Sequence, residues 1–251
     1  MPIWISAGLW GLLGASSLLA GAALAFLAKL PRWLTAGIMS FGCGVLISAV
    51  AYDLLEDGFE EGGILPIVVG AIVGSAAYAI ADWLVSRRGG QNRKQSGEGE
   101  QQHASSGGGL AIAIGSLLDG IPESIVLGLG LLAGHGVSVA MLAAIFLSNF
   151  PEGLSSALGM RAAGRSKTYI LGLWLTIVIV SGAASLIGAA AFGGAPPQIV
   201  AAVNAVAAGA LLTMVVNTMI PEAVKGEQNL TGSLVVLGLL VAFSLSNFSG
   251  G

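Results

Sequence analysis

Charged residues are scarce in this chain of 251 residues, of which only 9% are Asp, Glu, Lys or Arg, while 55% are hydrophobic. A soluble domain usually carries about a quarter of charged residues, because its surface faces water. The composition therefore excludes an ordinary soluble domain and predicts a protein whose outer surface faces lipid. The 39 glycines agree with this, since small residues let membrane helices pack closely.

Cysteine, histidine and basic clusters are also rare. The single cysteine, Cys43, lies in an apolar run, which excludes an internal disulfide and predicts a small buried side chain. A net charge of −3 and the lack of a basic cluster beside exposed aromatic residues argue against a nucleic-acid partner. The chain has no His-Glu-x-x-His motif of a zinc protease and no histidine in a long apolar run, so an enzyme is not expected.

The sequence contains many long apolar runs. Eight of them have about 18 residues or more, the length that a helix needs to span a bilayer. They cover approximately residues 3–27, 33–54, 64–86, 109–132, 137–160, 168–192, 198–221 and 231–248. We therefore predict an all-α, polytopic membrane protein with one transmembrane domain over 1–251. Residues 89–108, rich in Gly, Ser, Gln and charge, predict a disordered cytoplasmic loop within it.

The Lys and Arg residues predict the orientation of these helices. In an alternating topology all ten fall on one side, after the first, third, fifth and seventh helices. Positively charged loops stay in the cytoplasm, so both termini are expected on the outer side of the cell (inner) membrane. The acidic stretch from Asp53 to Glu61 is expected on that outer side. It is either a solvated loop or a mouth that concentrates cations.

One pattern occurs three times. It consists of a residue with a side-chain oxygen, two spacer residues, and then Pro and Glu, so that the Glu lies four positions after the first residue. It runs from Asp119 to Glu123, from Ser148 to Glu152 and from Thr218 to Glu222. Residues four apart lie on the same face of a helix. The proline also leaves the carbonyl four residues before it without its usual N–H donor and kinks the helix. Each segment therefore offers several oxygen ligands on one face.

Three of these acids, Asp119, Glu123 and Glu152, fall well inside predicted membrane helices. A charged carboxylate at mid-bilayer costs about 3 kcal/mol, and no Lys, Arg or His lies in the predicted helices to offset it. The acids are therefore expected to bind a cation. The alternative is that each stays neutral and forms hydrogen bonds between helices. Weaker candidates, which fit helix ends equally well, are Asp53, Glu56, Thr218 and Glu222 at the two ends of the pathway.

The layout resembles the ZIP (Zrt/Irt-like) family of divalent metal transporters, which have eight helices, both termini outside and metal-binding motifs on helices four and five. The stretch Asp119-Gly120-Ile121-Pro122-Glu123-Ser124 is similar to the family's helix-four motif His-Asn-x-Pro-Glu-Gly. On helix five, Ser148, Asn149, Pro151 and Glu152 match the family's His, acidic or amide residue, Pro and ligand Glu. Both family histidines are thus replaced, by Asp119 and Ser148.

The resemblance implies transport of divalent metal ions into the cytoplasm, most directly zinc, with Mn, Fe or Cd as further candidates. Carried over by position, the metal ligands are Asp119, Glu123, Ser148, Asn149 and Glu152. No cofactor is expected besides the transported ion, and the partners are this ion and the lipid bilayer, with a homodimer left open. An all-oxygen ligand set also suits harder ions such as Mn²⁺ or Mg²⁺. The alternative is a proton-coupled transporter of another small cation or solute that uses the same acids.

Overall fold

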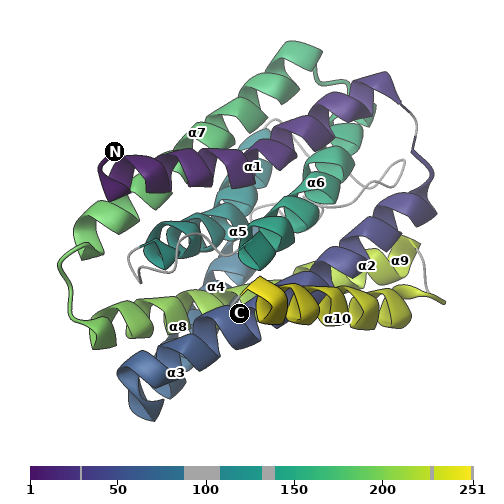
Figure 1. Ribbon diagram of the computed structural model, residues 1–251. Coiled ribbons are helices and arrows are strands. Elements are labelled where there is room, and N and C mark those ends of the chain that lie inside the picture. Colours follow the sequence, from purple (N-terminus) through teal and green to yellow (C-terminus); the bar gives the residue numbers. More distant parts are fainter. Residues whose placement is uncertain (29, 88–107, 132–138, 227–228, 250–251) are drawn as a thin grey trace.

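The computed structural model describes residues 1–28, 30–87, 108–131, 139–226 and 229–249. Helices form almost all of this part of the chain, and no strand occurs in it (Figure 1). In chain order the elements are α1 (Ile3–Leu27), α2 (Arg32–Ala49), the π-helix η1 (Val50–Glu56), α3 (Asp57–Gly62), α4 (Ile64–Arg87), α5 (Gly108–Gly130), α6 (Val139–Ala162), α7 (Lys167–Phe192), α8 (Pro197–Met214), the π-helix η3 (Val215–Met219), α9 (Ile220–Gly226) and α10 (Thr231–Ser249). The all-α class is confirmed for these residues. The predicted disordered loop 89–108 lies outside them, apart from Gly108, where α5 begins.

Several elements follow one another without a break. The elements α2, η1 and α3 form one helical segment, Arg32–Gly62, and α8, η3 and α9 form another, Pro197–Gly226. Counted this way, the described residues hold eight helical segments, and six of them agree with the predicted runs to within two residues at each end. The second and the seventh segments extend further than predicted.

The predicted runs end the second helix near residue 54 and leave a polar loop up to Gly63, and this prediction is wrong. Asp53 lies in η1, α3 continues to Gly62, and the helix breaks only at Gly63, whose φ is +77°. Glu is a good helix former, so acidic charge does not end a helix, whereas Gly adopts a positive φ at low cost. The seventh segment likewise continues to Gly226, past Pro221, with a π-turn just before the proline.

Glycines bring several helices into close contact. A Cβ atom added to Gly21 of α1 would overlap the carbonyl oxygen of Phe150 on α6, and one added to Gly153 of α6 would overlap that of Leu18 on α1. The same relation joins α2 to α10 and α4 to α8, through Gly44, Gly238, Gly74 and Gly209. Membrane helices pack in this way because hydrophobic driving force between them is absent in lipid.

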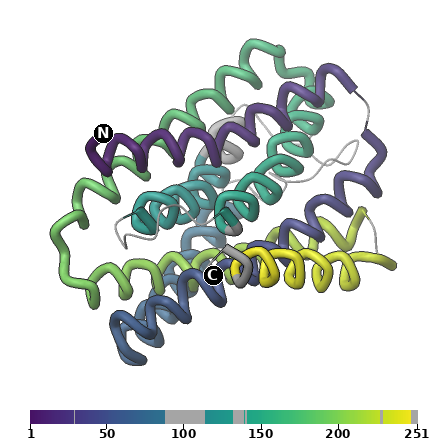
Figure 2. Tube along the Cα trace, viewed as in Figure 1, coloured from purple at the N-terminus to yellow at the C-terminus, as the bar shows by residue number. Residues whose placement is uncertain are grey.

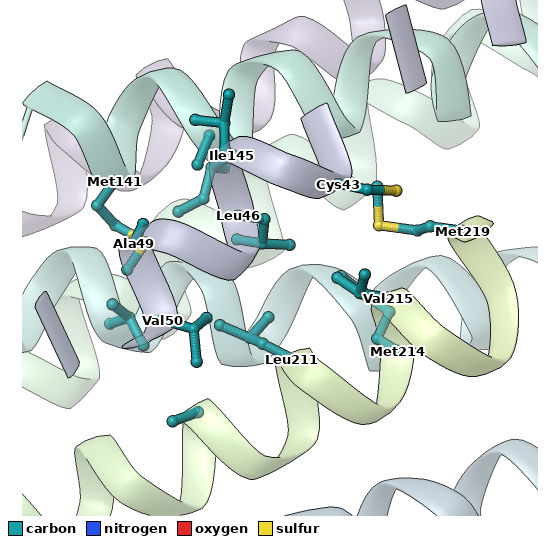
Figure 3. Packing of buried hydrophobic residues seen from close by; sticks show 14 of the residues in the cluster. Cys43, Leu46, Ala49, Val50, Met141, Ile145, Leu211, Met214, Val215 and Met219 are labelled. Atoms are coloured by element: carbon teal, nitrogen blue, oxygen red, sulfur yellow. The ribbon is translucent and has the colours of Figure 1, made fainter. Parts of the chain in front are cut away.

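The helices α5 and α6 lie in the middle of the bundle (Figure 2). On one side α6 packs on α1, and α5 packs on α7; on the other side α6 packs on α2, and α5 packs on α8. Figure 3 shows part of the core on this second side, where Cys43 and Leu46 of α2, Ile145 of α6 and Met219 of η3 meet. Cys43 is fully buried, as its apolar surroundings in the sequence predict.

The outer surface of the bundle is apolar. Helix α4 shows this best, because large side chains such as Leu65, Ile72 and Ile80 are 71%, 64% and 59% exposed. Among the described residues, the segments that are long and apolar enough to cross a membrane are Ile3–Leu27, Arg32–Gly62, Ile64–Arg87, Lys167–Phe192 and Pro197–Gly226. An apolar exterior on long apolar helices indicates a membrane protein, since water would not stabilise such a surface.

Candidate functional site

The helix-four motif lies on α5, which continues through Pro122 without a break. Asp119 and Glu123 are buried, with 1% and 2% of their surface exposed, although both carry a carboxyl group. They lie one turn apart on the same face, as the spacing of four predicts. Ser124 is buried beside them, and its hydroxyl donates to the carbonyl of Gly120 at 2.7 Å, within the helix.

The helix-five motif lies on α6, which likewise continues through its proline, Pro151. Ser148, Asn149 and Glu152 are all buried, with at most 4% exposed. The structure therefore places all five residues of the predicted metal site in the interior of the bundle. None of them faces lipid.

A contact between Ser148 and Glu123 joins the two motifs. The hydroxyl of Ser148 lies 3.3 Å from Oε1 of Glu123 and 3.0 Å from the carbonyl oxygen of Ile145, one turn earlier on α6. The hydroxyl has one proton, so it can donate to only one of them at a time. When it donates to the backbone carbonyl, the lone pairs of its oxygen can accept a cation.

Asp119 has a partner on a third helix. The hydroxyl of Tyr78, on α4, donates a hydrogen bond to Oδ1 of Asp119. Tyr78 is 2% exposed, so the bond is formed away from solvent and lipid. Asp119 is therefore held toward α4, whereas Glu123, on the same helix, contacts α6.

The carbonyl that Pro151 deprives of its helical donor belongs to Leu147. It faces α2, where a Cβ atom added to Gly42 would come within 3.1 Å of this oxygen. Because residue 42 is glycine, α2 can approach the carbonyl closely and cover it. The structure thus accounts for the freed carbonyl of Leu147 by close helix packing.

The four weaker candidates lie on other elements. Asp53, on η1, accepts a hydrogen bond from Ser246 of α10 at 3.3 Å, and Glu56 is exposed. The hydroxyl of Thr218, on η3, donates to the carbonyl of Met214 at 2.6 Å. Glu222, on α9, lies 3.9 Å from the ammonium group of Lys225. The π-helix η1 thus contains Asp53 and Glu56, and η3 contains Thr218; π-turns are frequent at functional sites.

The donor set of the site consists of oxygen atoms. Glu123 and Glu152 supply carboxylates, Ser148 a hydroxyl and Asn149 an amide, and residues 110–160 contain no Lys or Arg. Such a set suits divalent ions that accept oxygen ligands. In the described part of the chain, however, no three Asp, Glu, His or Cys side chains converge closely enough to bind one metal ion together. Asp119, Glu123 and Glu152 therefore do not converge on one point. Instead, Glu123 contacts Ser148 and Asp119 contacts Tyr78.

Two contributors to this region were not identified from the sequence. One is Tyr78, which follows Gly70 and Gly74 at a spacing of four and so lies on the face of α4 that the glycines pack against α8. This spacing was a usable signal for burial. The other is Gly42, for which the sequence contains no comparable signal, because its role depends on which helix lies opposite.

No model of a known protein family matches the chain, and no curated protein is similar enough to it to count as a relative.

Proposed function

We propose that this protein is a transporter that carries divalent metal ions into the cytoplasm through an oxygen-lined site between α5 and α6. Zinc is the first candidate substrate, because the motifs resemble those of the ZIP family, and Mn, Fe and Cd are the next. The observation that carries the proposal is the contact of Glu123 with Ser148, which joins the two Pro-Glu segments inside the bundle.

Burial of the carboxylates supports a cationic substrate. Glu123 and Glu152 are 2% and 4% exposed, and buried charges in proteins are stable when they are paired or coordinate a metal. The sequence places no Lys or Arg on α5 and only Arg161 near the end of α6. A divalent ion would therefore supply the positive charge that the two helices lack.

The kinds of ligand support transport over permanent binding. Hydroxyl, amide and carboxylate oxygens, without imidazole or thiolate, bind zinc less firmly than structural zinc sites do. A transported ion has to leave its site after it has entered it, so moderate binding is an advantage. The same carboxylates can exchange the metal for protons, which offers a means of coupling to a proton gradient.

The proposal includes eight membrane-spanning helices with both termini outside. Arg161, at the end of α6, donates to the carbonyl of Ala25, at the end of α1, over 2.8 Å. Lys167, where α7 begins, lies 5.6 Å from the ring centre of Phe26. The basic ends of these helices therefore lie together, as expected for one cytoplasmic side. The segment Arg32–Gly62 begins with a basic residue and ends with the acidic residues of α3. Its acidic end is therefore expected on the outer side.

The proposal can be tested by metal uptake into vesicles that contain the purified protein. Zn²⁺, Mn²⁺, Fe²⁺ and Cd²⁺ are offered to the wild type, to Glu123→Gln and to Glu222→Gln as a matched control. We expect Glu123→Gln to abolish uptake of the preferred ion, because an amide cannot replace the charged ligand. Glu222→Gln should keep it, because Glu222 already lies beside a lysine.

Gel filtration and thermal unfolding in detergent show whether each variant is folded. Uptake by folded Glu123→Gln at the wild-type rate would reject the site. The wild type could instead take up none of these ions but take up another small cation when a proton gradient is applied. That result would reject metal transport in favour of the alternative function.

A further inference from the structure

The helix α4 is bound to the rest of the bundle mainly through α8. Gly70 and Gly74 pack against the backbone of α8 around Ala202 and Val206. Ser75 adds a hydrogen bond of 2.8 Å with Thr213 of α8. The remaining surface of α4 is largely exposed and apolar, and its packing on α5 is slight.

Tyr78 is the exception on α4. It is a large polar side chain, 2% exposed, one turn beyond Gly74, and its hydroxyl donates to Asp119 on α5. A buried hydrogen bond to a carboxylate is stronger than one between neutral groups. This bond is a direct polar connection between α4 and α5, which pack on each other only slightly.

Asp119 and Glu123 contact different helices. Asp119 and Glu123 lie one turn apart on α5, yet one bonds to α4 and the other contacts Ser148 on α6. No three acidic side chains converge in the described part of the chain. A metal ion that used Asp119 together with Glu123 and Glu152 would therefore require at least one of these side chains to move, and a move of Asp119 toward Glu123 would draw it away from Tyr78.

We propose that Tyr78 is a latch that competes with the metal ion for Asp119; this rests on the proposed metal transport. An ion bound at Glu123 and Glu152 attracts the carboxylate of Asp119 far more strongly than a neutral hydroxyl does. Asp119 then turns to the metal, its bond to Tyr78 breaks, and α5 is released from α4. Because breaking this bond opposes metal binding, the latch lowers the affinity of the site and connects ion binding with helix contact.

The first test measures metal affinity of the purified, full-length protein by Cd²⁺ and Zn²⁺ titration. Tyr78→Phe removes only the hydroxyl, and Tyr52→Phe is its matched control, since Tyr52 is partly exposed and its ring packs at a tilt against that of Phe243. We expect Tyr78→Phe to bind metal about two- to tenfold more tightly, the net effect of one hydrogen bond. Tyr52→Phe should bind as the wild type does. In an Asp119→Asn background, Tyr78→Phe should have no further effect.

The second test observes the tyrosine itself. Metal addition should change a tyrosine band in the infrared difference spectrum of the wild type and of Tyr52→Phe, since Tyr78 loses its acceptor. The band should be missing in Tyr78→Phe and in Asp119→Asn. A role of Tyr78 in folding alone would not produce a metal-dependent band.

The outcomes separate the latch from the proposed function. If the wild type binds metal and Glu123→Gln does not, while Tyr78→Phe binds equally or more weakly, the latch is overturned and the transport site stands. Weaker binding would mean that Tyr78 positions Asp119 as a ligand. If neither the wild type nor Tyr78→Phe binds any of the ions, the proposed function fails, and the latch fails with it.

Discussion

Three segments of this protein share the pattern of Pro followed by Glu, but their surroundings differ. Glu123 and Glu152 lie in the middle of long helices and are almost completely buried. Glu222 lies in the short helix α9, its side chain is 14% exposed, and the ammonium group of Lys225 is 3.9 Å away. Glu123 contacts the neutral hydroxyl of Ser148.

This difference shows what the pattern itself specifies. It supplies a carboxylate and a helix with one backbone donor removed, and it does so equally in all three places. The charge of the neighbours and the burial then decide whether the carboxylate needs an external cation. The first two segments lie in residues 110–160, which contain no Lys or Arg, and we assign them to the proposed site, whereas the third lies beside Lys225.

The largest loss of stability is expected where α1 packs against the second segment, on α6. Gly21→Val should prevent stable folding, because its side chain would overlap the carbonyl of Phe150, next to Pro151. Overpacking of this kind costs about 3 kcal/mol or more when backbone is the obstacle. Gly172→Val is the matched control, since Gly172 of α7 has no atom within 4 Å of the added Cβ. Thermal unfolding in detergent compares the two, and equal stability would contradict the packing described.

The next largest effect concerns the buried carboxylate of the second segment. Glu152→Gln should weaken metal binding by at least the roughly 10–100-fold that loss of an outer-shell partner costs. It should also remove the increase in unfolding temperature that metal gives the wild type, because stabilisation follows ligand affinity. Thermal unfolding with and without Cd²⁺ measures this. Unchanged metal stabilisation in Glu152→Gln would place the ion elsewhere.

A smaller effect is expected at the contact between the two buried segments. Ser148→Ala removes the hydroxyl that lies 3.3 Å from Glu123. Loss of one such group should weaken metal binding about two- to tenfold, equivalent to roughly 0.5–1.5 kcal/mol. Titration with the preferred ion tests this, with Ser244→Ala, at an exposed position of α10, as control. If Ser148→Ala weakened metal binding as much as Glu152→Gln does, Ser148 would contribute more to binding than one hydroxyl contact.

The smallest effect is expected at the third segment. Lys225→Gln removes the neighbour of Glu222, but Lys225 is 55% exposed, and such surface pairs contribute at most about 1 kcal/mol. Uptake by this variant should stay within about twofold of the wild type. Uptake that falls as far as in Glu123→Gln would show that the third segment belongs to the site.

Much of the fold could be predicted from local composition. The apolar runs gave the positions of six helical segments closely, because a lipid-facing helix needs a minimum number of apolar residues. The error at Asp53 to Gly63 arose because charge was treated as a helix breaker, although only Gly63 has the backbone conformation that ends the helix. The π-turns of η1 and η3 left no signal in the apolar pattern.

The site was predictable in part for the same reason. Spacing within one helix predicted that Asp119 and Glu123 share a face, and depth in the apolar run predicted their burial. Contacts between helices depend on which faces meet. The bond of Tyr78 to Asp119 and the position of Gly42 against Leu147 could therefore not be derived from local patterns.

The most direct measurement of the central claim is the position of a bound ion in crystals of the protein soaked with Mn²⁺ or Cd²⁺. We predict one anomalous-scattering peak between α5 and α6, about 2.0–2.6 Å from carboxylate oxygens of Glu123 and Glu152. The peak should be absent from Glu123→Gln crystals. A peak beside Glu222 with none between α5 and α6, or equal peaks in wild type and variant, would contradict the account.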